Sequence, residues 1–500
     1  MLTPEDFKQI EKQANKLYSD LELEIIQEIA ERIANVGYAN TVVVNDVRIA
    51  QEIGLLYEDV IDLVAKYNEA SVSQIKEIFE TAGAKSLAYD DKIYREAGLN
   101  PVPMKRSRNI MQLIAATVEK TNYNLNNLVA TTANTSQMQF IEAMNKAYME
   151  VSTGVKSYSQ SIIDTIKDIS NKGAYVEYPS GQHRSLESAV RMNILTSVNQ
   201  TSGKIQLLRA DDMNWDLMEI SAHSGARPEH AEWQGKIVSR SGRKGYLSLK
   251  DIGYGEVTGF QGVNCRHTWF PYYEGSKFTY TDNELEKIKN EKVTYNGEKI
   301  SKYDATQIQR KMERQIRQDK KEIAGLQGVL TGNITDNKLI EDTRTAFAKK
   351  SLIYKTHQTQ LEDFLKQTSL KKDETRTYIG NYTKETKTQL ANVTKIANKY
   401  NKSNIIGLKV NNIEIREIGE HVISRTYARG VEFKDIENTL KNPLDYGKIK
   451  IDNEGRKSFS VIGEKVTVYV NPDTGKITTT HATSSKLVNK LKEKENENNR

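Results

Sequence analysis

The sequence predicts a mainly α-helical protein with long helices in its N-terminal and middle regions, a small α/β core, and a C-terminal α+β domain. Apolar residues recur at helical spacing over most of the 500 residues. Only eight prolines interrupt the chain, which leaves room for long helices. Patterns typical of strands occur in only two places. Because a single core stops growing well below this length, several domains are expected.

Changes in composition predict five segments. They are a helical arm or bundle (1–212), a compact α/β core with a Cys/His cluster (213–277), a charged helical spacer (278–400), an α+β domain (401–487) and a flexible tail (488–500).

The N-terminal segment is expected to be entirely helical. Its first helix, over 4–35, carries an apolar stripe that includes Phe7, Ile25 and Ile33. Further helices are expected over 46–66, 71–81, 107–170 (two or more) and 184–209. Ser185 is suited to cap the last of these as its N-cap residue.

The stretch 220–273 holds the only cysteine and three of the seven histidines. The candidate metal ligands are His223, His230, Cys265 and His267. A structural zinc ion accepts such mixed thiolate and imidazole ligands, although the compact C-x-x-C spacing of many zinc sites is missing. The alternative is a hydrogen-bonded polar knot that holds a glycine-rich fold together. A cysteine nucleophile is disfavoured, because no basic pair that would activate Cys265 is recognisable.

Two blocks of this stretch carry a resemblance to a known family. They are SAHSGARPEHAEWQG (221–235) and GVNCRHTWFP (262–271). Residues 1 to about 330 resemble the phage minor capsid proteins related to the Mu-type head morphogenesis proteins. The resemblance implies a virion protein made in the host bacterial cytoplasm, with few copies near the portal vertex of a tailed-phage head. It also implies oligomeric assembly with portal and other capsid proteins, and packaged DNA as a further candidate partner.

Arginines repeat on the charged helix that is expected between 281 and 330. Arg310, Arg314 and Arg317 follow i, i+4, i+7 spacing and so share one side of the helix. We interpret this ridge as a solvated face that Glu313 and Asp319 balance. Contact with DNA is the alternative.

The C-terminal domain is expected to contain a helix over 418–429, a second over 431–440, and strands over 458–462, 465–470 and 476–482. The candidate catalytic residues are His421, Arg425, Arg429, Thr479, His481, Ser484 and Lys486. The first three share one helix face, and Thr479 and His481 share one strand face with Ile477.

Two histidines beside cationic and hydroxyl groups suit RNA cleavage that needs no cofactor. One histidine would remove the ribose 2′-OH proton, the other would protonate the leaving oxygen, and the arginines or Lys486 would neutralise the phosphorane. The helix–helix–hairpin order resembles the barnase–EndoU–colicin–RelE-like ribonuclease domains, which implies RNA as the substrate. Two alternatives remain: an inactive C-terminal domain in a purely structural capsid protein, and a delivered polymorphic toxin with a helical carrier.

Composition limits other functions. A net charge of +6 is small for this length and does not indicate nonspecific electrostatic binding to DNA. One cysteine excludes an intramolecular disulfide framework. The first ten residues are polar, so no signal peptide is expected, and the sequence has no apolar run long enough to predict a membrane span.

Overall fold

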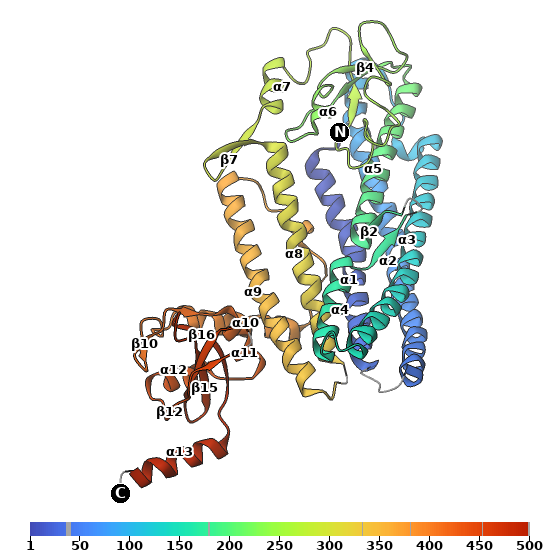
Figure 1. Ribbon diagram of the computed structural model, residues 1–500. Coiled ribbons are helices and arrows are strands. Elements are labelled where there is room, and N and C mark those ends of the chain that lie inside the picture. Colours follow the sequence, from blue (N-terminus) through green and yellow to red (C-terminus); the bar gives the residue numbers. More distant parts are fainter. Residues whose placement is uncertain (37–41, 179–180, 333, 381, 453, 499–500) are drawn as a thin grey trace.

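The computed structural model describes residues 1–36, 42–178, 181–332, 334–380, 382–452 and 454–498. Long helices lie side by side in an elongated body, with a compact loop-rich unit at one end (Figure 1). The C-terminal domain lies beside the opposite end, next to the first turns of α9 (Asn337–Thr368). The predicted fold class, mainly α with a small α/β core and a C-terminal α+β domain, is confirmed.

The helical body is formed by six further helices and one short hairpin in addition to α9. They are α1 (Pro4–Val36), α2 (Val42–Glu96), α3 (Arg108–Ser152), α4 (Tyr158–Lys172), α5 (Leu186–Asp212), α8 (Lys302–Thr331) and the hairpin β1 (Tyr175–Glu177) and β2 (His183–Ser185). The 3-10 helix η1 (Met104–Arg106) connects α2 to α3. One continuous apolar core runs through these helices and includes Phe7, Phe140 and Phe347.

Helix α8 packs inside the body although 278–400 was expected to be a charged spacer. Two glycines allow the close approach. A Cβ on Gly325 would lie 2.7 Å from Ser170 Oγ of α4, and one on Gly328 would lie 2.6 Å from the Gln27 carbonyl oxygen of α1. The buried Lys321 of α8 also pairs with Glu22 of α1. The charged middle of the chain is therefore part of the main core.

Helix α2 is one continuous element where two helices, over 46–66 and 71–81, were expected. The residues between them include neither Gly nor Pro, so no local signal ends the helix there. Gly83 lies within α2 where a Cβ would come 2.9 Å from Ile205 Cδ1 of α5. In α5, the predicted cap is confirmed, because Ser185 Oγ accepts a hydrogen bond from the Ser188 amide.

The compact unit contains a four-stranded sheet in the order β5-β4-β3-β6. Its elements are β3 (Leu217–Ile220), α6 (Pro228–Ala231), β4 (Ile237–Ser239), β5 (Leu247–Ser248) and β6 (Trp269–Pro271). Strand β3 pairs antiparallel with both β4 and β6. Trp233, Phe260 and Trp269 fill the core beneath the sheet together with Cys265. Helix α7 (Asp282–Lys289) and the hairpin β7 (Lys292–Tyr295) and β8 (Glu298–Ser301) then lead into α8.

The C-terminal domain packs two short helices on a sheet in the order β11-β16-β15-β14-β12. Its elements are η2 (Glu374–Thr377) and α10 (Lys384–Asn401), which lead in, and then β9 (Lys409–Val410), β10 (Ile413–Glu414), β11 (Glu417–Ile418), α11 (Glu420–Ala428), α12 (Phe433–Lys441), β12 (Asp445–Tyr446), β13 (Lys450–Ile451), β14 (Lys457–Ile462), β15 (Val466–Val470), β16 (Lys476–Ala482) and α13 (Ser485–Asn498). Tyr400 of α10 belongs to the core of this domain, where its hydroxyl lies 2.7 Å from Thr426 Oγ1.

The expected face of the last strand was wrong in one respect. The β15–β16 pairing shifts register between Tyr469 and Val470, so Thr479 pairs with Tyr469 while Ile477 pairs with Val470. This irregularity breaks the two-residue alternation. Ile477 is therefore buried in the core, whereas Thr479 and His481 are only half-buried.

In the part of the chain that the structure describes, no helix combines the length and the apolar character needed to cross a membrane.

Candidate metal centre

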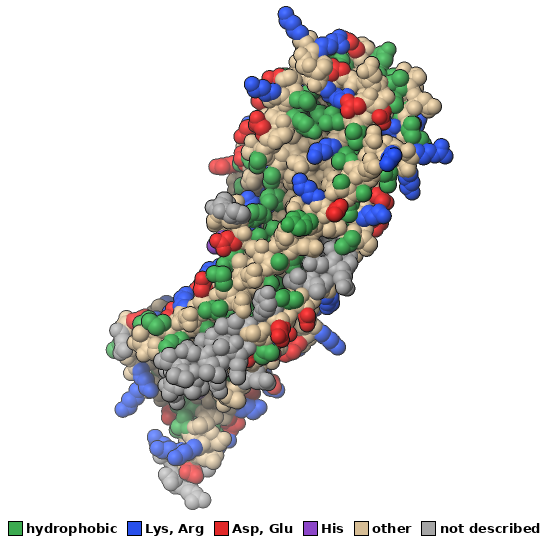
Figure 2. Space-filling model, turned by 90° about the vertical axis from the view of Figure 1, so that its right-hand side faces the viewer, with side chains coloured by type: hydrophobic (Ala, Val, Ile, Leu, Met, Phe, Trp, Pro, Cys, Tyr) green, Lys and Arg blue, Asp and Glu red, His purple; other side chains and the backbone are tan. Residues whose placement is uncertain are grey.

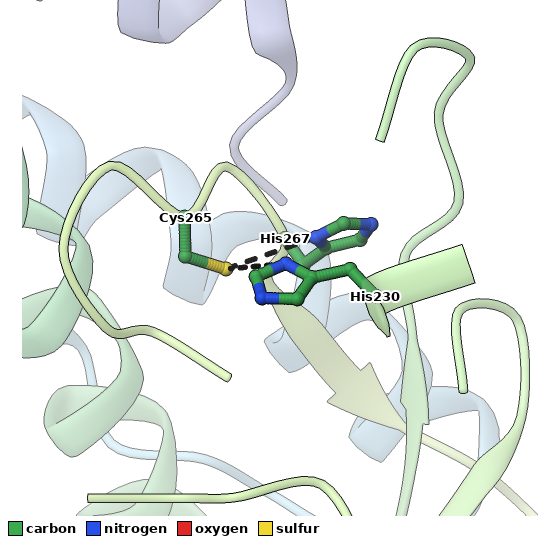
Figure 3. Close-up of side chains that lie close together, drawn as sticks. All are labelled: His230, Cys265 and His267. Carbon is green, nitrogen blue, oxygen red and sulfur yellow. Dashed lines mark hydrogen bonds between the residues drawn. The ribbon is translucent and has the colours of Figure 1, made fainter. Parts of the chain in front are cut away.

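Three of the four predicted ligands meet in the compact unit. His230 comes from α6, and Cys265 and His267 come from the segment that enters β6, so residues 35 positions apart converge (Figure 3). One ligand atom from each lies within 4.8 Å of the others, and all three side chains are buried. A buried Cys/His₂ group is a donor set that zinc accepts.

The hydrogen bonds fix which ring nitrogen faces the sulfur. The Nδ1 atoms of His230 and His267 lie 3.8 and 3.7 Å from Cys265 Sγ. His230 Nε2 lies 2.8 Å from the Thr258 carbonyl oxygen, and His267 Nε2 lies 3.2 Å from Gln234 Oε1. These oxygens can only accept, so in each ring we assign the hydrogen to Nε2 and the lone pair to Nδ1.

Both lone pairs therefore point at a single thiol. A thiol has one hydrogen and can satisfy only one of them, which leaves a buried acceptor without a donor. A metal ion would bind the thiolate and both Nδ1 atoms at once. The Nε2 contacts to oxygen atoms are the outer contacts that orient histidine ligands in metal sites.

Burial sets the protonation of the cluster. It lowers the pKa of His230 and His267, so both imidazoles are neutral near pH 7, as metal ligands must be. Burial also raises the pKa of the Cys265 thiol. A protonated, buried thiol is a poor nucleophile.

His223 lies beside the cluster and outside the group of ligand atoms. Its ring stacks on His267 with centroids 4.2 Å apart, and burial lowers its pKa to about 4. Its Nε2 is buried without a hydrogen-bond partner. The structure thus brings together three of the four predicted ligands. The fourth, His223, contacts the group only by stacking on the ring of His267.

Close backbone contacts hold the ligand segments in place. Asn199 of α5 donates from Nδ2 to the carbonyl oxygen of Cys265 at 2.9 Å, which anchors the segment before β6. A Cβ on Gly259 would lie 1.9 Å from the Gly253 carbonyl oxygen, so only glycine fits there. Thr258, which contacts His230, belongs to this glycine-dense loop.

The chain matches the family described as "Phage minor capsid protein 2" over residues 2–366. The chain belongs to this family. A curated relative, the "Structural protein" of Lactococcus phage LL-H, is 29% identical over 282 residues, which cover 53% of this chain and 73% of the relative. No solved structure matches significantly. Membership implies a place in the virion, with other virion proteins as partners.

The family match includes both blocks that contain the candidate metal ligands of this minor capsid protein, and it ends at residue 366. The C-terminal domain therefore lies outside the family match. Any activity of that domain rests on its own residues.

The candidate catalytic residues of the C-terminal domain are only partly brought together. Arg425 Nε donates to His421 Nε2 at 3.2 Å, and Arg429 Nη1 donates to the Thr480 carbonyl oxygen of β16. His481 packs on Tyr469 with ring centroids 5.2 Å apart. Among the described residues, no hydrogen bond or ring contact joins His421 to His481. Ser484 and Lys486 are exposed at the start of α13.

Helix α9 supplies carboxylates that the sequence did not single out. Glu341 pairs with Arg425 at 2.6 Å and with Arg429 at 2.9 Å, and Asp342 lies 3.5 Å from Arg425. Both arginines of the candidate catalytic set are thus neutralised by the helical body. Glu341 precedes α11 by about eighty residues, so no sequence spacing indicates this contact.

The interpretation of the arginine ridge on α8 as a solvated face holds for Arg314, which is exposed, and is wrong for the rest of the ridge. Glu313, Arg317 and Asp319 are buried, and Arg310 is half-buried against other arginines. Gln234 and Thr258 were also missed, because amide and carbonyl groups that orient a histidine carry no sequence signature.

Proposed function

We propose that this minor capsid protein is a structural component of the portal vertex, present in few copies and in contact with the portal protein. The shape of the molecule carries this proposal. Helix α2 has 55 residues and spans about 80 Å, and the compact unit lies at one end of the body (Figure 1). A rod with a folded unit at its end offers two separated contact surfaces, which suits a connector between head components.

Cross-linking mass spectrometry on purified virions tests this proposal. Lys236, Lys250 and Lys277 are exposed on or next to the compact unit and are the reporter residues. We expect cross-links from them to the portal protein, and their loss when heads are dissociated before cross-linking. Absence of the protein from purified virions would overturn the proposal. Cross-links only to tail proteins would also contradict it.

We further propose that His230, Cys265 and His267 hold a structural zinc ion that stabilises the compact unit. The two lone pairs aimed at one sulfur support this proposal. Zinc at the Cys/His group would join α6 to the segment before β6, and metal binding would then add directly to the folding free energy.

Cys265→Ser distinguishes zinc from a hydrogen-bonded knot. Serine keeps one hydrogen for a hydrogen bond but lacks the thiolate that zinc prefers. With zinc, the unmodified chain unfolds at a lower temperature after treatment with a strong chelator, whereas the variant is already destabilised and does not respond. If chelation leaves the unfolding temperature of the unmodified chain unchanged and the variant is equally stable, the cluster is held by hydrogen bonds without a metal ion.

The second candidate function is a metal-independent ribonuclease in the C-terminal domain. The position of Arg429 favours it. Arg429 contributes to the lowering of the pKa of both His421 and His481, after burial as the main cause, so its charge acts on both histidines. A cation that both histidines sense is suitably placed to stabilise a phosphorane. In this structure Arg429 forms an ion pair with Glu341.

The ribonuclease proposal is tested with the full chain and with Glu341→Gln, which weakens the ion pairs with Arg425 and Arg429. Glu362→Gln, an exposed carboxylate on the same helix, is the matched control. We expect EDTA-resistant RNA cleavage that rises in Glu341→Gln, is unchanged in Glu362→Gln and is lost with His421→Ala or His481→Ala. No cleavage by the folded Glu341→Gln chain would leave a purely structural domain.

A further inference from the structure

Six arginines line one cavity whose wall also includes His230, Cys265 and His267. The cavity has a volume of 350 Å³, and its arginines are Arg191, Arg227, Arg266, Arg310, Arg314 and Arg376. They come from α5, the loop before α6, the segment between the metal-ligand candidates, α8 and η2, so the fold gathers them from five places. A neighbouring cavity of 220 Å³ shares four of them and adds Arg184 and Arg317.

The carboxylates around the cavity do not balance these charges. Glu11 pairs with Arg191, Arg266 and Arg376 at 3.2–3.6 Å. Glu187 pairs with Arg191, and Asp373 pairs with Arg376. Within the described residues, no carboxylate forms an ion pair with Arg227, Arg310 or Arg314. Six guanidinium groups thus share three ion-paired carboxylates, and one of these, Glu187, also pairs with Arg317.

The half-buried Arg310 shows the cost of this arrangement. Burial, with Arg376 and Arg266 nearby, lowers the pKa of its guanidinium to about 10. Another carboxylate in the region, Glu313, has its pKa raised to about 7 by burial and is only partly charged at neutral pH. Five of the six arginines are half-buried and Arg314 is exposed. Charges partly withdrawn from water without matching anions are unfavourable. A bound anion would remove that cost.

We propose that this cavity binds the phosphate groups of a small ligand about the size of a nucleotide. The planar guanidinium group binds phosphate oxygens in pairs, and a cluster of arginines is the usual protein solution for a multiply charged phosphate. The volume lies within the range of small-molecule sites. Asn264 adds an amide to the lining.

The site differs from a surface that binds the DNA backbone. On the face drawn in Figure 2, Lys and Arg side chains lie among Asp and Glu and form no continuous basic patch. The arginines of the cavity instead converge between packed elements. The phosphate would come from a free ligand, such as pyrophosphate or a nucleoside triphosphate, or from the 5′ end of a nucleic acid strand.

Titration calorimetry on the full chain tests the proposal, with pyrophosphate, ATP, adenosine and a short single strand with and without a 5′-phosphate as probes. We expect saturable binding of the phosphate-bearing probes and none of adenosine. Pyrophosphate or ATP as the tightest ligand identifies a free phosphate source. Preference for the 5′-phosphorylated strand over its unphosphorylated twin identifies a nucleic acid end. Each titration is repeated after chelator treatment to separate the arginines from a bound metal.

Arg310→Gln and Arg314→Gln are the decisive variants, and Arg106→Gln, an exposed arginine of η1, is the control. Losing one charge-assisted contact should weaken binding about tenfold to a hundredfold. Neither variant loses an ion pair, so both should fold at least as stably as the unmodified chain. The proposal is overturned if no phosphate-bearing probe binds the folded chain. Equal binding by Arg310→Gln, Arg314→Gln and Arg106→Gln would also overturn it.

Discussion

Replacing Lys321 by methionine tests whether α8 belongs to the core of the body. Lys321 is 7% exposed and Glu22 is 1% exposed, and the two form an ion pair between α8 and α1. Lys321 Nζ donates to Glu22 Oε1, and among the described residues Glu22 Oε2 has no hydrogen-bond partner. Methionine keeps the length of the side chain and removes its charge, so the carboxylate stays buried alone. Breaking a buried pair from one side costs about 3–5 kcal/mol.

The expected loss depends on pH. Burial raises the pKa of the Glu22 carboxyl, Lys321 opposes that rise, and Glu187 adds to it. In Lys321→Met the folded-state pKa is higher still. A raised folded-state pKa favours folding fully below the unfolded value, and this contribution is lost as pH rises through the folded value. The variant should therefore be closer to the unmodified chain at pH 5 than at pH 8.

Urea unfolding followed by far-UV circular dichroism measures the effect, with the double variant Glu22→Met/Lys321→Met as the control. Replacing both partners by apolar residues should restore stability to within about 1 kcal/mol or exceed it. The reasoning fails if the double variant is as unstable as Lys321→Met. It also fails if Lys321→Met costs less than about 1 kcal/mol, the value of an exposed pair.

Two further predictions concern single positions. Burial raises the pKa of Asp90 to about 8, so its contribution to stability is fully present below about pH 4 and is lost as pH rises through 8. Asp90→Asn should flatten the dependence of the thermal midpoint on pH in this range, and an unchanged slope would contradict the assignment. Gly259→Ala would place its Cβ against the Gly253 carbonyl oxygen and should destabilise by about 1–3 kcal/mol or more in urea unfolding. Gly54→Ala, in α2 with nothing near its Cβ, should stabilise by about 0.5–1 kcal/mol, and equal effects of the two changes would refute the packing argument.

The local elements of the C-terminal domain were predictable because their signals are local. The alternation of Val466, Val468 and Val470 and the turn through Pro472 and Gly475 predicted β15 and β16 to within one residue at each end. The helix α12 ends just before Asn442-Pro443, as the restriction on a residue before proline requires. The register shift at Tyr469 was not predictable, because no residue of β15 or β16 signals where the pairing of the two strands shifts.

Long-range pairing marks the limit of what the sequence predicts. The spacing of Arg310, Arg314 and Arg317 correctly places them on one side of a helix. It cannot indicate that Glu11 and Glu187, more than a hundred residues earlier, share their surroundings. The same limit applies to Glu341 and α11. The charged composition of α8 favoured solvent exposure, whereas the structure buries the charges in pairs between helices.

The grouping of the candidate metal ligands was predictable in part. Residue types and the i, i+2 spacing of Cys265 and His267 identified candidate ligands, and Pro228 excluded a long helix through His230. The distance between His223 and His230 depended on the loop around Gly225, which has a positive φ of 73°. His223 stacks on His267 and lies outside the ligand group.

Zinc K-edge X-ray absorption on the purified full chain tests the central claim most directly, because it counts the atoms around the metal. The proposed zinc site predicts about one zinc per chain, with one sulfur and at least two imidazole nitrogens bound directly to the metal, and loss of that signal in Cys265→Ser. A folded chain that binds no zinc, or one whose zinc has no sulfur neighbour, would contradict it.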